Sequence, residues 1–158
     1  MAEKFYSGRD GKLLLDRTAD DVADESETGL IEQLKVRNWS LQSNLNLLDI
    51  TTLGDNHKDY TPGIIGYSGS ATLLYYKDAS NNIQVSNWLR DAGVGTQSAG
   101  VTTEEKIRLQ LRLYDGVDYR SLLFKAYITS ATIGATVGDV ISADFNFTVC
   151  GKIAQASI

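Results

Sequence analysis

The chain contains very few of the residues that build disulfides and metal centres. Its 158 residues include one cysteine, Cys150, and one histidine, His57. A single cysteine cannot close an internal disulfide, and a usual structural zinc site needs four cysteine or histidine ligands. No apolar run approaches the ~18–20 residues of a membrane-spanning helix, and the N-terminus carries no basic stretch followed by an apolar one. We therefore expect no disulfide scaffold, no membrane-spanning helix and no secretory signal.

Basic residues are also in deficit. The chain has 20 aspartates and glutamates against 15 lysines and arginines, which gives a net charge of −5. This balance repels nucleic acid at long range and supplies no strong phosphate-binding surface. DNA is therefore not expected as a tightly held ligand, although DNA that must pass without sticking remains compatible with the charge. The apolar fraction of 42% fits one folded domain of this length.

Catalytic motifs are missing as well. The stretch Gly66–Ser70 lacks the G-x-S-x-G spacing of a nucleophile elbow, and there is no P-loop or G-x-G-x-x-G motif. Carboxylate pairs such as Asp20 and Asp21 are adjacent in a solvated run, which is a poor setting for the pKa shifts of acid–base catalysis. The run Asp55–Asp59 lacks the glycine-centred pattern of a calcium loop, and we interpret His57 as a hydrogen-bonding loop residue. We predict a protein that is not an enzyme and holds no metal or cofactor.

What the sequence does contain is alternation. In Ile107–Leu113 every odd position is apolar and every even one polar, which predicts a strand with one buried and one wet face. Asp115-Gly116 then predicts a hairpin into a strand at Tyr119–Ala126, and the alternation returns over Val137–Val149. With 14 glycines and one proline, the chain is expected to be mainly β. Further strands are predicted at Lys12–Leu15, Lys35–Gln42, Asn46–Thr52 and Ser70–Lys77.

One predicted strand is apolar on both faces, because Leu74 and Tyr76 lie opposite to Leu73 and Tyr75. Such a strand is covered on both sides, either by a core and a helix or by a core and a neighbouring subunit. One short helix is predicted at residues 80–90, where Trp88 belongs to an apolar stripe and is expected to dock onto the sheet.

Two polar segments leave alternatives open. The acidic segment 17–32 is expected to be an exposed insertion, which is either a plain solvated loop or an acidic rim that repels DNA or meets a basic partner. The polar connection Gly54–Gly63 is either a plain surface loop or a functional one, since loops of this length in compact domains often carry function.

A series of short motifs resembles one known family. In chain order they are Val36-Arg37-Asn38-Trp39-Ser40-Leu41, Leu48-Asp49-Ile50-Thr51-Thr52-Leu53-Gly54-Asp55, Tyr60-Thr61-Pro62-Gly63, Ser68-Gly69-Ser70-Ala71-Thr72, Phe124-Lys125-Ala126-Tyr127-Ile128-Thr129, Val137-Gly138-Asp139 and Phe145-Asn146-Phe147-Thr148-Val149-Cys150-Gly151. Their order and spacing are similar to those of the tail tube proteins, or major tail proteins, of long-tailed bacteriophages. The resemblance covers most of Val36–Gly151.

The resemblance implies a single domain with an antiparallel β-sandwich or barrel-like core flanked by a helix. In this family, subunits join edge to edge into hexameric rings with an inner β-barrel, and the rings stack into the conduit for DNA ejection. The expected location is the virion tail, after assembly in the host cytoplasm. The expected partners are further copies, a terminator, a baseplate or tip and, in some tails, a sheath. DNA passes as unbound cargo, and no membrane is involved.

By position, the resemblance also assigns sites. The expected inter-ring stacking loop is 53–63, and the expected N-terminal arm is 1–10. The site residues are Asp55, Asn56, His57, Lys58, Asp59, Tyr60 and Pro62 in the loop, Lys4, Phe5 and Tyr6 in the arm, and Leu74, Tyr76 and Trp88 for β-edge and helix packing. The polar face of the last long strand, with Asp144 and Asn146, either lines the lumen or forms the outer surface.

Two other functions stay open at this point. One is the tube of a contractile injection device, which has the same architecture. The other is a carbohydrate-binding β-sandwich that acts as an adhesin, which would need tryptophans and tyrosines clustered with Asn or Asp on exposed loops. Trp39 and Trp88 lie instead in predicted regular elements.

Overall fold

The computed structural model describes residues 11–16, 30–32, 35–75, 107–114 and 117–157. These residues form eight strands and no helix. The predicted N-terminal arm 1–10, residues 17–29 of the acidic segment, Tyr76 and the predicted helix with Trp88 lie outside the described residues.

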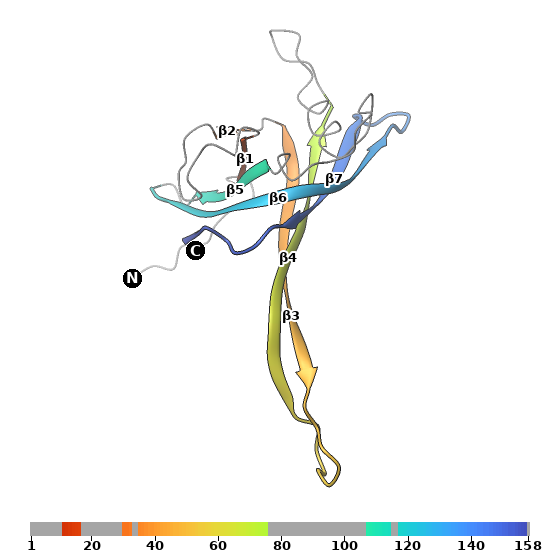
Figure 1. The fold of residues 1–158 in the computed structure, drawn as a ribbon. Coiled ribbons are helices and arrows are strands. Elements are labelled where there is room, and N and C mark those ends of the chain that lie inside the picture. The colour runs from red at the N-terminus through yellow and green to blue at the C-terminus, as the bar shows by residue number, and fades with distance from the viewer. Residues whose placement is uncertain (1–10, 17–29, 33–34, 76–106, 115–116, 158) are drawn as a thin grey trace, which may run out of the picture.

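All eight strands belong to one sheet in which every pair is antiparallel (Figure 1). The strands are β1 (Lys12–Asp16), β2 (Ile31–Glu32), β3 (Val36–Asp49), β4 (Tyr60–Leu74), β5 (Ile107–Tyr114), β6 (Tyr119–Gly134), β7 (Ser142–Val149) and β8 (Gln155–Ser157). Their order is β2-β1-β5-β6-β7-β4-β3, and β8 pairs with β6. The mainly β, antiparallel fold class predicted from the sequence is confirmed.

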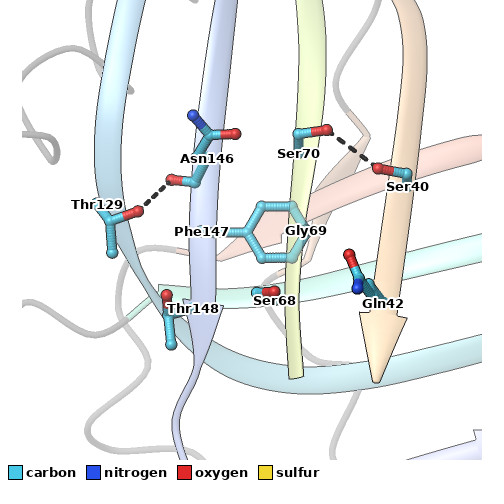
Figure 2. A pocket seen from close by; sticks show the side chains of 9 residues that line it. All are labelled: Ser40, Gln42, Ser68, Gly69, Ser70, Thr129, Asn146, Phe147 and Thr148. Carbon is cyan, nitrogen blue, oxygen red and sulfur yellow. Dashed lines mark hydrogen bonds between the residues drawn. The ribbon is translucent and has the colours of Figure 1, made fainter. Parts of the chain in front are cut away.

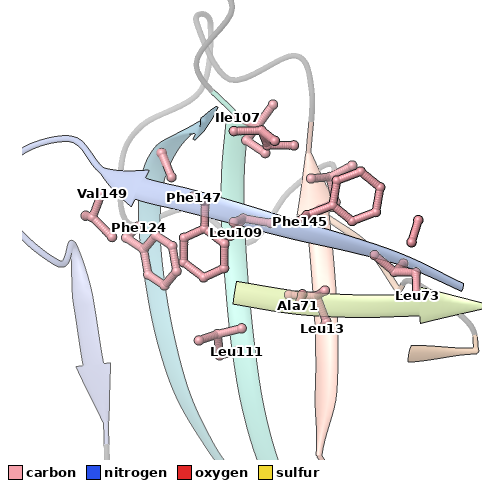
Figure 3. Packing of buried hydrophobic residues seen from close by; sticks show 14 residues of the cluster. Leu13, Ala71, Leu73, Ile107, Leu109, Leu111, Phe124, Phe145, Phe147 and Val149 are labelled. Carbon is pink, nitrogen blue, oxygen red and sulfur yellow. The ribbon is translucent and has the colours of Figure 1, made fainter. Parts of the chain in front are cut away.

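The core lies on the apolar face that alternation predicts. In β7 the side chains of Ala143, Phe145, Phe147 and Val149 are buried, and the residues between them are exposed. Phe124 of β6 stacks on Phe147 with 5.6 Å between ring centroids (Figure 3). The same cluster joins Leu13 of β1 to Leu73 of β4, which are four strands apart in the sheet order, so the sheet folds back over its own apolar face.

The structure corrects the expectation that the even positions of Ile107–Leu113 are wet. Arg108 and Gln110 are fully buried, and Gln110 accepts a hydrogen bond of 2.8 Å from Nε of Arg112. The register places Leu14 and Leu123 beside Gln110 on the same face, and both are buried. The sheet is therefore covered on both faces around β1, β5 and β6. Polar side chains can be buried in this way where they are hydrogen-bonded. The alternation of apolar and polar residues in the sequence does not reveal that the polar face is covered.

A second correction concerns β3 and β4. The two strands predicted at Lys35–Gln42 and Asn46–Thr52 are one strand of 14 residues, and β4 begins ten residues before the strand predicted at Ser70. β3 and β4 remain paired along this region. Their register is irregular between Leu45 and Leu47, where a β-bulge accommodates an extra residue. The loop between the two strands therefore spans residues 50–59 instead of the predicted 53–63, and Tyr60 and Pro62 lie in β4.

The distal half of this hairpin projects from the body as a two-stranded arm (Figure 1). β7 pairs with Ser68–Leu74 of β4, and among the described residues, residues 60–67 are paired with β3 alone. Pro62 lies in this stretch, where one edge of β4 is free and a missing backbone N–H is tolerated. At ~3.3 Å per residue, the 15 residues of β4 span roughly 50 Å.

The last predicted strand also begins later than expected. Val137–Ile141 precede β7, and Val137, Val140 and Ile141 are exposed. Gly138 has a φ of +88°, which fits a turn between β6 and β7 and explains why alternation stops there.

Gly69 gives a stability test of this packing. A Cβ at Gly69 would lie 2.5 Å from Cζ of Phe147 and closer still to the carbonyl oxygen of Ser40. Overpacking of this kind costs about 1–3 kcal/mol, so Gly69→Ala should lower the free energy of unfolding by that amount in urea denaturation. Gly66→Ala is the matched control in the same strand, because its Cβ would meet nothing within 4 Å. Equal unfolding midpoints for the two variants would contradict the packing described.

Candidate functional site

The first candidate surface is the polar face of β3, β4, β7 and the second half of β6, which lies opposite the core. Hydrogen bonds between side chains connect neighbouring strands across it. Oγ of Ser40 lies 3.0 Å from Oγ of Ser70 (Figure 2), and Oγ1 of Thr72 donates to Oδ1 of Asp144 at 2.6 Å. Nδ2 of Asn146 donates to Oγ of Ser130 at 2.7 Å. The predicted site residues Asp144 and Asn146 are therefore on one exposed face, two residues apart on β7.

A groove of about 290 Å³ crosses this polar face (Figure 2). It is lined by Ser40, Gln42, Ser68, Gly69, Ser70, Thr129, Asn146, Phe147 and Thr148. These residues offer hydroxyl and amide groups but no carboxylate, imidazole or amine. A serine or threonine needs a neighbouring base to act as a nucleophile, so the groove can hydrogen-bond water or a polar molecule but has no group that would activate one.

The second candidate surface is the arm. Its side chains include many large apolar residues that are about half exposed or more, namely Leu45, Leu47, Leu48, Ile50, Leu53, Tyr60, Ile64 and Ile65. Strand alternation places Leu47 and Leu48 on opposite faces, so both faces of the ribbon are apolar. Exposed apolar surface on this scale marks an interaction site or an aggregation hazard.

The apex of the arm, the loop of residues 50–59 between β3 and β4, is held by its own hydrogen bonds. The backbone N–H and the hydroxyl of Thr52 both donate to Oδ2 of Asp55 at 2.7 Å. The backbone N–H of Thr51 donates to Oδ1 of Asp49 at 2.9 Å, and that of Asp59 donates to Oγ1 of Thr51 at 3.0 Å. The predicted loop residues Asp55, Asn56, His57, Lys58 and Asp59 are thus brought together at the apex. Thr51, Thr52 and Leu53 belong to the same apex. Thr51 and Thr52 lie outside the predicted loop 53–63, and Leu53 lies inside it but was not assigned as a site residue.

Hydrogen bonding also sets the charge state of the apex. Hydrogen bonds from the side chain and the backbone of Thr51 lower the pKa of Asp49 below its usual value. Those from the backbone and the side chain of Thr52 likewise lower the pKa of Asp55. Both carboxylates are therefore ionised acceptors that hold the turn.

The third candidate surface is the pair of sheet edges. β3 is the last strand in the sheet order, and among the described residues no strand pairs with its outer edge. β5 pairs with β6 only as far as Ala126, so the edge of residues 128–134 on that side also lacks a partner within the described ranges. Of the predicted edge residues, Leu74 is half-buried and lies opposite Ser142.

Other kinds of site are not indicated. No group of three or more histidine, cysteine, aspartate or glutamate residues that could hold a metal occurs among the residues described. The described part of the chain also contains no helix long and apolar enough to cross a membrane.

Comparison with known proteins identifies the fold. No family model and no curated protein sequence matches the chain. Solved structures do match: a chain of the SPP1 tail tube superposes with a TM-score of 0.64 at 18% identity, covering 94% of this chain and 77% of that one. The chain has the tail-tube fold.

Two further structures of this fold superpose over almost their whole length. One is a chain in the tail of an empty GTA particle with C6 symmetry, with a TM-score of 0.64, 15% identity and coverage of 96% and 98% of the two chains. The other is a chain in the baseplate of the anti-feeding prophage AFP, with a TM-score of 0.67, 7% identity and coverage of 96% and 95%. At such identities the likeness concerns the course of the backbone and does not extend to the side chains of the surfaces described above.

The apex network predicts a pH dependence. A carboxylate whose pKa is lowered in the folded state stabilises that state above the ordinary pKa, here 3.8, and the contribution is lost as pH falls through the lowered value. The amide signals of Thr51 and Thr52 in NMR spectra should therefore change little from pH 7 to about 5 and shift with midpoints below 3.8. Asp55→Asn should remove the acid shift of Thr52 alone. A shift of Thr52 centred above pH 4 would contradict the network.

Proposed function

We propose that the chain is a tube subunit of a tail, in a virion or virion-like particle, whose copies join edge to edge into rings that stack into a conduit. The observation that carries this proposal is the projecting arm, which is apolar on both faces and has no covering strand beyond β3 and β4 themselves among the described residues. A two-stranded ribbon is marginally stable in water alone. The arm is therefore completed by contacts with other copies.

Ring formation uses the two unpaired edges. The outer edge of β3 in one copy pairs with residues 128–134 of β6 in the next, so the polar face of β6, β7, β4 and β3 continues around the ring. A contact between two different surfaces of the same chain forms a closed ring when the rotation closes. Six copies per ring is the number implied by the sequence resemblance, and the C6 symmetry of one matching structure supports it.

The polar face lines the lumen in this assembly. Its hydroxyl and amide groups are neutral, and Asp144 is the carboxylate that joins them on β7. Such a wall repels phosphates weakly over about a Debye length, ~8 Å at physiological salt. The groove that crosses it is lined, among the described residues, by no lysine or arginine to hold them, so DNA passes as unbound cargo.

The tube of a contractile injection device is a second candidate. It is favoured by the match to the AFP baseplate and by a TM-score of 0.60 to a chain of PVC, an extracellular contractile injection system, in its sheath-tube complex. In that case a baseplate and a sheath would be partners. The genes beside that of this chain would decide between the two devices.

The arm gives the first test of the assembly. Ile64 is 84% exposed in one copy, so Ile64→Asp should change the free energy of unfolding by no more than ~0.5 kcal/mol. Because the arm is buried between copies in a tube, the same variant should form no tubes in negative-stain microscopy under conditions where the unmodified chain does.

Val117→Asp is the matched control, since Val117 is also exposed but lies between β5 and β6. It should still form tubes. The proposal fails if the unmodified chain stays monomeric at high concentration, or if Ile64→Asp assembles as well as the control.

Asp144 gives the second test. Asp144→Lys places a cation on the proposed lumen wall, where it would attract phosphates, so particles with this variant should eject DNA more slowly while their tubes assemble normally. Asp144→Asn is the matched control, because an amide oxygen can still accept the hydrogen bond from Thr72. An unchanged ejection rate with Asp144→Lys would remove the lumen assignment and favour an outer surface.

A further inference from the structure

A small pocket lies where β7 ends and the chain continues to β8. It has a volume of about 210 Å³ and is lined by Lys125, Cys150, Gly151, Lys152 and Ala154. Two of these residues carry an ammonium group, and none of the five is acidic. Concave sites in which a few charged groups converge are the usual form of small-ligand sites. The pocket therefore differs in kind from the groove on the polar face, whose described lining is neutral.

The backbone holds the walls of this pocket in place. The N–H of Cys150 donates to the carbonyl oxygen of Lys125 at 2.8 Å, and the N–H of Ala154 donates to that of Leu123 at 2.8 Å. Between these two bonds the connection has more residues than β6 does, so it arches away from the edge of the sheet. Ile153, within this arch, packs against the core. The arch is thus fixed at both ends and in its middle.

A row of charged residues crosses the sheet beside the pocket. The register places Arg108 of β5 opposite Lys125 of β6, and Asp16 of β1 opposite Arg108 on its other side. Cys150 extends the row beyond Lys125 through its backbone hydrogen bond. Arg108 is fully buried. Like charges directly opposite each other on neighbouring strands repel, and the repulsion is stronger away from water.

The charges in this row and in the pocket do not balance. Arg108, Lys125 and Lys152 are cations, and Asp16 is the acidic residue that the described register brings to the same row. Arg108 and Lys125 both take part in interactions within the chain, so the sign of the site is set by the sum of these charges and not by one side chain. Three positive charges against one negative charge give +2 over these four residues. A concave site of this sign attracts anions.

We propose that this pocket binds a small oxyanion of the phosphate class, held between the ammonium groups of Lys125 and Lys152. Phosphate oxygens accept charge-assisted hydrogen bonds from lysine. A phosphate dianion offsets the whole positive excess, whereas a carboxylate offsets half of it. A phosphodiester of DNA carries the same oxygens but only a single negative charge, and its two ester substituents do not fit between the arch and β6. The free ion is therefore the ligand that the site favours.

Cys150 gives a direct readout, because it lines the pocket, is partly exposed and is the only cysteine of the chain. Iodoacetate is an anion and iodoacetamide is neutral, and the thiolate displaces iodide from either reagent to form an S–C bond. In the full chain, Lys125→Gln with Lys152→Gln should lower the ratio of the iodoacetate rate to the iodoacetamide rate several-fold, because fewer cations concentrate the anion. Arg37→Gln with Lys58→Gln is the matched control. It removes the same charge at exposed positions outside the pocket and should leave the ratio unchanged.

Inorganic phosphate is then titrated against chloride at constant ionic strength. It should slow the alkylation of Cys150 by iodoacetamide in the unmodified chain but not in the double lysine variant, and acetate at the same concentration should protect less. Unprotected alkylation in phosphate would overturn the proposal. Equal protection by acetate, or by a short DNA duplex, would also overturn it, because the pocket would then take carboxylates or phosphodiesters.

Lys152→Gln alone keeps the test valid if the double variant does not fold, since Lys152 is exposed. This single variant should still lower the ratio of the two alkylation rates and weaken the protection by phosphate. A ratio equal to that of the unmodified chain would contradict the pocket described.

Discussion

The structure depends on the unequal lengths over which β4 pairs with its two neighbours, β3 and β7. β3 and β4 are registered with each other along almost their whole length, but β7 continues the sheet only beside Ser68–Leu74. The proximal half of the hairpin is therefore part of a packed sheet, and the distal half is a ribbon without a core of its own. An isolated two-stranded ribbon is only marginally stable in water, so the exposed apolar residues of the arm would stabilise it further if a partner covered them. The proximal half fixes the arm to the body of the protein, since Ala71 and Leu73 are buried in the core.

The surfaces of the chain divide according to what they must do. The arm is largely apolar, whereas the groove on the polar face is lined mainly by hydroxyl and amide groups. Apolar surface gains free energy by burial at roughly 25 cal/mol per Å², so it suits contacts that hold an assembly together. Neutral polar groups that already bond each other, as Ser40 and Ser70 do, gain little from a passing polyanion. The described residues thus separate apolar surface, which favours burial, from a polar face whose groups already bond one another.

The sequence predicts the core better than the arm, for a physical reason. Alternation in Ile107–Leu113 and Ala143–Val149 reflects burial by the chain itself, and the core faces of both segments are as predicted. The arm is buried by no part of the described chain, so its strands do not alternate: Leu47 and Leu48 follow each other, and Gln42, Ser43 and Asn44 form a polar run. The strand was divided wrongly after this polar run begins, at residues 43–45. Arg108 was assigned to solvent for a related reason, since its residue type does not reveal a second covered face. Leu53 was placed in the predicted loop 53–63 but not among its site residues, because a lone leucine beside a glycine carries no pattern and its exposure is visible only once the turn is built.

Edge pairing between copies, as we propose it, is compatible with an identity of only 7–18% to the matching structures. Strand edges present N–H and C=O groups that every residue except proline possesses, so the contact that would build a ring is written in the backbone rather than in side chains. Side-chain identity is restricted where space is short, as at Gly69 beneath the ring of Phe147, where a Cβ would clash.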